Sequence, residues 1–96
     1  MLPPVEKSFE FLLVKKEVGD NKIMLYLPTG DSYYMKPGDV KKYLELMDFE
    51  DWDHCIDYVW NFHTVVIDLR GQRYFWVGQD CFREAISKTQ LVGAEL

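Results

Sequence analysis

The sequence is poor in cysteine, in basic residues and in long apolar runs, and each shortage excludes a class of protein. Its two cysteines, Cys55 and Cys81, are too few for a disulfide scaffold and suit a reducing compartment. Lys and Arg total 11 against 16 Asp and Glu, so the net charge of -5 opposes broad binding to nucleic-acid phosphates. No apolar run approaches the ~18 residues of a membrane span, and residues 1–7 lack the features of a signal peptide. We therefore expect a soluble, cytoplasmic protein.

Signatures of catalysis are also missing. The sequence contains no phosphate-binding loop, no G-x-S-x-G nucleophile elbow and no H-E-x-x-H zinc motif. With 96 residues, the chain is too short for a Rossmann enzyme or a barrel, and we expect a single domain over residues 1–96. An apolar content of 48% excludes a disordered tail. The sequence thus predicts a folded domain that is not an enzyme and needs no cofactor.

Apolar periodicity and turn residues predict an α+β fold. The expected strands are residues 8–18, 22–27, 32–35, 63–69 and 73–77, and the expected helices are residues 39–47, 49–61 and 81–90. Asp39 and Asp48 are the predicted N-caps of the first two helices. The order is therefore β-β-β-α-α-β-β-α. Such an order predicts an antiparallel sheet packed on one face by two or three helices.

The last two strands should form a hairpin around a two-residue turn at Gly71 and Gln72. That turn would place Arg70 opposite Arg73 and Ile67 opposite Trp76. The predicted core face of this hairpin consists of Val65, Ile67, Leu69, Tyr74 and Trp76. On the other face, the two arginines would have only Phe75 beside them as an aromatic partner. We therefore do not expect direct binding of nucleic acid, because single-strand binders use several aromatic platforms.

Negative charge is concentrated in residues 43–68, which contain seven acidic residues and no Lys or Arg. Glu50 and Asp51 fall in the first turn of a predicted helix, where the helix dipole favours carboxylates. Asp53 and Asp57 lie four residues apart on the predicted solvent face, where they repel each other. Two interpretations are open. The helix either has a solvated surface or presents an acidic surface to a basic partner.

Aromatic residues are abundant for so small a core, with three Trp, six Tyr and six Phe. We expect Tyr33, Tyr34, Tyr58, Phe62 and Phe75 to be exposed. Exposed aromatics are typical of protein interfaces, either with another protein or in a homodimer, although each ring could instead pack at the edge of the core.

The functional hypothesis joins the two features. Its predicted binding residues are Glu50, Asp53, Asp57, Tyr58 and Phe62, with the carboxylates engaging a basic protein surface and the rings anchoring it. A stoichiometric inhibitor or regulator of a nucleic-acid-handling protein is one concrete form. A complete DNA mimic is not expected, because seven carboxylates cannot imitate a long phosphate track.

The alternative is a small enzyme or metal-dependent protein that uses His54 with nearby carboxylates. Glu50, His54 and Asp57 share one helical stripe and could reach one cation, but such a row supplies at most three ligands. The two Cys and two His match no zinc-module spacing, so no metal is expected. A thiol nucleophile would need a base within reach. Cys81 lies at a predicted helix N-terminus without one, and Cys55 is expected to be a small buried residue.

Overall fold

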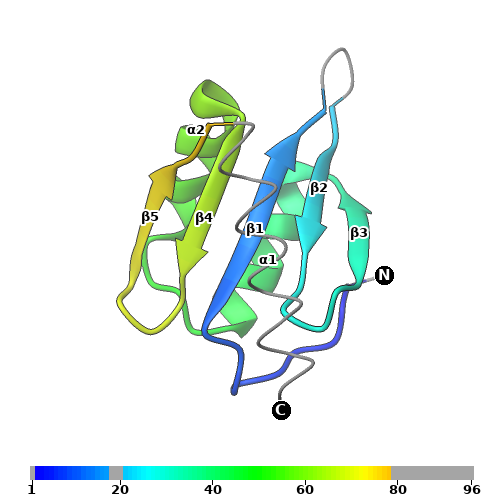
Figure 1. The fold of residues 1–96 in the computed structure, drawn as a ribbon, viewed down its shortest axis with the longest axis vertical. Helices are drawn as coiled ribbons and strands as arrows, with labels where there is room; N and C mark the ends of the chain where they lie inside the picture. Colours follow the sequence, from blue (N-terminus) through cyan, green and yellow to red (C-terminus); the bar gives the residue numbers. More distant parts are fainter. Residues whose placement is uncertain (1, 18–20, 79–96) are drawn as a thin grey trace.

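Five antiparallel strands form one sheet, and two helices cover one of its faces (Figure 1). The structure, a computed structural model, describes residues 2–17 and 21–78 of the chain. Its elements in chain order are β1 (Phe11–Lys16), β2 (Ile23–Tyr26), β3 (Ser32–Met35), α1 (Pro37–Leu46), α2 (Trp52–Phe62), β4 (Thr64–Asp68) and β5 (Arg73–Trp76). Their order across the sheet is β3-β2-β1-β4-β5. The predicted α+β class is confirmed, and the helix predicted over residues 81–90 lies outside the described residues.

Strand β1 lies at the centre of the sheet because it pairs with β2 on one side and β4 on the other. Leu12 and Val14 point toward the helices and are fully buried. Leu13, which points to the opposite face, is only 1% exposed. A continuous apolar run suits such a strand, since a central strand can be buried on both faces.

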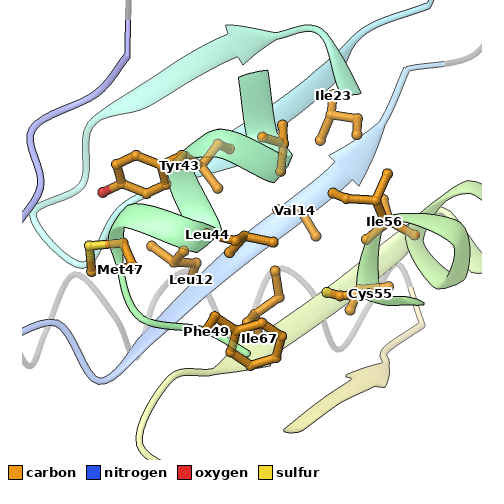
Figure 2. Close-up of a cluster of buried hydrophobic side chains, with 14 of the residues drawn as sticks. Leu12, Val14, Ile23, Tyr43, Leu44, Met47, Phe49, Cys55, Ile56 and Ile67 are labelled. Carbon is orange, nitrogen blue, oxygen red and sulfur yellow. The ribbon is translucent and has the colours of Figure 1, made fainter. Parts of the chain in front are cut away.

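The core lies between the sheet and the helices (Figure 2). Apolar residues spaced three and four positions apart point inward from both helices: Val40, Tyr43 and Leu44 from α1, and Cys55, Ile56 and Val59 from α2. The hydroxyl of Tyr43 donates to the carbonyl of Pro4 at 2.7 Å, so this buried polar group is satisfied. Burying each large apolar side chain stabilises the fold by about 1.5–3 kcal/mol.

Both helices begin at residues other than those predicted. Helix α1 has Lys36 as its N-cap and Pro37 in its first turn, so Asp39 lies inside the helix. Proline is favoured there because its missing N–H would have no helical partner. Helix α2 begins after Asp51, because Asp48 adopts a left-handed φ of 61° and ends the preceding turn. Phe49 is therefore outside α2, although it is buried as predicted.

The β4–β5 register differs from the predicted one by two residues. Asp68 pairs with Arg73, and Ile67 pairs with Tyr74. The reason is local: one carboxylate oxygen of Asp68 accepts the Gly71 N–H at 2.9 Å, and the other lies 3.0 Å from Nε of Arg73. A shift by two preserves the faces of the strands. The predicted core position of Trp76 is nevertheless wrong, because β5 is an edge strand and this side chain is 55% exposed.

Candidate functional site

The five residues predicted to bind a partner do not share one face of the structure. Tyr58 lies on the flank of α2 that faces β5, where its ring contacts Tyr74. Asp53 lies on the flank that faces α1, where it is 2.9 Å from Nζ of Lys41. A helix turns ~100° per residue, so Asp53 and Phe62 lie roughly on opposite sides of α2. The predicted set is therefore split between two flanks of this helix.

The acidic segment also loses part of its free charge on folding. Asp48 pairs with Lys7 at 2.7 Å. Asp53 pairs with Lys41, which lowers the pKa of this carboxyl mainly through their hydrogen bond. Asp68 pairs with Arg73 at 3.0 Å. All these cations come from outside residues 43–68, so counting charges within the segment overestimates its exposed negative charge.

Four acidic residues of the segment have no ion pair with a Lys or Arg among the residues that the structure describes: Glu45, Glu50, Asp51 and Asp57. All four are exposed. Glu50 and Asp57, both predicted to bind a partner, thus remain exposed and without a direct ion pair to Lys or Arg among the described residues, although Asp57 lies within electrostatic range of Lys41.

The other predicted residues, Tyr58 and Phe62, lie beside β5, and we call Tyr58, Phe62, Tyr74 and Trp76 the α2–β5 aromatic row. The rings of Phe62, Tyr58 and Tyr74 contact one another in that order, and Trp76 adjoins them through the bond of its backbone N–H to the Tyr58 hydroxyl. Tyr58 stacks on Phe62 with ring centroids 4.4 Å apart. The same ring meets Tyr74 edge-on at 5.1 Å, and Tyr74 meets the buried Phe49 at 6.2 Å. Offset and edge-on ring contacts are favourable beyond their burial. The row therefore extends from the core to the surface, where Phe62 is 47% and Trp76 is 55% exposed.

Hydrogen bonds fix the tyrosines of this row. The hydroxyl of Tyr74 donates to the carboxylate of Asp51 at 3.1 Å, and the other oxygen of that carboxylate lies 2.9 Å from Nδ1 of His54. Burial, reinforced by the bond to Asp51, raises the pKa of Tyr74 to about 12, so the phenol keeps its proton at neutral pH. Because its carboxylate is engaged in this way, Asp51 does not cap α2 with its side chain.

Tyr58 also protects the edge of the sheet. The backbone N–H of Trp76 donates to the Tyr58 hydroxyl at 3.0 Å. The next N–H, that of Val77, donates to the carbonyl of Thr64, so the two groups point in opposite directions, as alternation along a strand requires. Exposed edge groups invite pairing with other strands. The Tyr58 hydroxyl covers one of them.

The remaining candidates are the residues considered for metal binding or catalysis. Among the described residues, no group of three or more His, Cys, Asp and Glu could hold a metal ion. Cys55 is fully buried, as predicted, and burial raises the pKa of its thiol to about 12. The thiol is therefore protonated at neutral pH and does not supply a thiolate nucleophile. Cys81 lies outside the described residues.

Exposure of the aromatic residues follows the predictions only in part. Tyr34, Phe62 and Phe75 are exposed as expected, whereas Tyr33 and Tyr58 are half-buried. Trp76 was missed, because strand alternation assigned it to the core face. Its exposure depends on β5 being at the edge of the sheet, and alternation within one strand carries no information about that position.

Comparisons with known protein families, with curated proteins and with solved structures find no match. Neither helix in the described part of the chain has the length and apolar character needed to cross a bilayer. The functional interpretation of the α2–β5 aromatic row and of the exposed carboxylates Glu50 and Asp57 therefore depends on their own chemistry.

Proposed function

We propose that this domain is a non-catalytic protein-binding module that contacts a basic protein surface through the α2–β5 aromatic row and the exposed carboxylates Glu50 and Asp57. The observation that carries the proposal is the exposure of Phe62, at 47%, at the end of a chain of ring contacts, and of Trp76, at 55%, whose backbone N–H is bonded to Tyr58. Aromatic side chains are enriched among the residues that dominate the energy of protein interfaces.

The fixed geometry of the row favours binding. Tyr58 is held by its contacts with Phe62 and Tyr74 and by its bond to the Trp76 N–H. A surface that is already ordered loses little side-chain entropy when a partner binds. The rings are therefore better suited to anchoring a partner than Tyr34, which is 62% exposed and has Nζ of Lys22 6.0 Å from its ring centroid.

Charge selects the class of partner. Glu50 and Asp57 are exposed carboxylates without a Lys or Arg partner among the described residues, and the chain has a net charge of -5. Electrostatic complementarity raises the association rate with a basic surface. Asp53 is assigned a smaller role than its sequence position indicated, because Lys41 already pairs with it. An inhibitor or regulator of a nucleic-acid-handling protein fits this pattern, since such proteins present basic surfaces.

The proposal is tested by placing a photo-crosslinking phenylalanine analogue at position 62 and, as a control, at position 34. Both native side chains are exposed aromatics, but Tyr34 lies on β3, at the opposite edge of the sheet. We expect a basic protein to be crosslinked from position 62 and not from position 34 in cells of the native host. Equal crosslinking from both positions would reject the row as the contact surface.

The crosslinked protein is then purified, and its affinity is measured for Asp57→Lys and for a charge-matched control, Glu45→Lys. Both native carboxylates are exposed and have no Lys or Arg partner among the described residues, so both variants should fold. We expect Asp57→Lys to weaken binding at least ~10-fold at low salt, and Glu45→Lys to have a much smaller effect. Similar losses in both variants would show that only net charge matters.

A further inference from the structure

We propose that the end of the row formed by Phe62 and Trp76 binds an arginine side chain of the partner. This inference rests on the proposed function and specifies which chemical group the partner supplies. A general acidic surface would accept lysine and arginine alike, so the distinction can be measured.

The site combines the C-terminus of α2 with the last residue of β5. Helix α2 ends at Phe62, and β4 begins two residues later at Thr64. Val65 of β4 pairs with Trp76, and the Thr64 hydroxyl donates to the carbonyl of Val77. The end of β5 is thereby held close to the last turn of α2, as the yellow and green segments show in Figure 1.

Backbone groups make this end electronegative. The last carbonyls of a helix have no donor within the helix, and they form the negative end of its dipole. The carbonyl of Val59 accepts the N–H of His63, the carbonyl of His63 accepts the backbone N–H of Lys16, and the last turn of α2 itself contains no basic residue. A cation from a partner would find hydrogen-bond acceptors there.

The opposite flank of α2 shows how an indole in this fold binds a cation. Nζ of Lys16 lies 4.3 Å from the ring centroid of Trp60. Among the described residues, no Lys or Arg takes a comparable place over the ring of Trp76. Among the large apolar side chains of the described residues, that of Trp76 is also the second most exposed, after Tyr34. A cation supplied by a partner can therefore make a cation–π contact with the ring of Trp76.

Arginine fits this combination better than the other candidates. Its planar guanidinium stacks on flat rings such as Phe62 and Trp76, and its fork of N–H groups can reach several carbonyls at once. The ammonium of lysine is a compact, strongly hydrated charge without a face that stacks. A nucleobase could also stack, but its phosphates would meet a chain with a net charge of -5.

The test uses two fluorescent peptides of equal length and charge in one Gly/Ser background, one containing arginine and the other lysine. Fluorescence anisotropy measures their affinities for the full-length protein at low salt. We expect the arginine peptide to bind roughly fivefold more tightly or better. In Trp76→Leu this preference should fall to about one. In Tyr34→Leu, the control at the other edge, it should be unchanged.

Equal affinities for the two peptides in the native protein, or no measurable binding of the arginine peptide, would overturn the inference. A preference for arginine that survives in Trp76→Leu would also overturn it. Trp76→Leu retains the backbone N–H that donates to Tyr58, so the edge of the sheet should stay intact. If the peptides do not discriminate while Asp57→Lys still weakens partner binding, the proposed function stands and only the arginine site is wrong.

Discussion

Replacing Tyr58 with phenylalanine isolates one hydrogen bond at the edge of the sheet. The change deletes the hydroxyl that accepts the Trp76 N–H at 3.0 Å and keeps the ring that stacks on Phe62 and meets Tyr74. A typical intramolecular hydrogen bond contributes about 0.5–1.5 kcal/mol to stability. Water can partly replace the lost acceptor, because Trp76 is 55% exposed. We therefore expect a loss of about 0.5–1 kcal/mol in the free energy of unfolding.

Urea denaturation measures this loss, and hydrogen exchange of the Trp76 amide locates it. For a domain of this size, each kcal/mol lowers Tm by about 4–8 °C. The amide of Trp76 should exchange faster in Tyr58→Phe, whereas the amide of Val77 should not, because it donates to Thr64. Tyr34→Phe, which removes an exposed hydroxyl, should change stability by less than about 0.5 kcal/mol. An unchanged free energy together with unchanged exchange at Trp76 would refute the assigned bond.

Two further predictions concern buried groups. In a Cys81→Ser background, Cys55 should react with a thiol reagent only as fast as the protein opens, because the side chain is fully buried and its pKa is raised to about 12. Rapid reaction in the absence of urea would contradict this. Burial raises the pKa of Tyr43 from 10.0 to about 12, so the folded state holds a proton that the unfolded state releases above pH 10. The free energy of unfolding should therefore fall as pH rises through that window, by up to ~1.4 kcal/mol per pH unit from this group, and less steeply in Tyr43→Phe.

Local sequence patterns predict the architecture of this domain well. The third strand was predicted over residues 32–35, the range that β3 occupies. The side chains of β4 are assigned to the correct faces of the sheet despite the error in register, because a shift by two residues keeps the period of a strand. Turn residues and periodicity act over a few positions, so they can be recognised without knowledge of the rest of the chain.

Features that depend on distant residues could not be predicted in this way. The ion pair of Asp53 with Lys41 joins two helices, and that of Asp48 with Lys7 joins residues 41 positions apart. The position of β5 at the edge of the sheet depends on the order of all the strands. The exposure of Trp76 depends on that order and on its position at the end of β5, since Tyr74 on the same strand is half-buried. The candidate site was therefore only half found: Tyr58 and Phe62 were identified, whereas Tyr74 and Trp76 had been assigned to the core.

The distribution of charge and aromatic rings separates two aspects of partner binding. Exposed ion pairs contribute about 0–1 kcal/mol each, and salt limits their range to ~8–10 Å. Carboxylates such as Asp57 should therefore act mainly on the rate of encounter with a basic partner. Most of the affinity should come from Phe62 and Trp76, because desolvated aromatic anchors dominate interface energies and control dissociation. Under the proposed function, the exposed end of the aromatic row would therefore anchor the partner, and the negative charge of the domain would only guide the partner toward it.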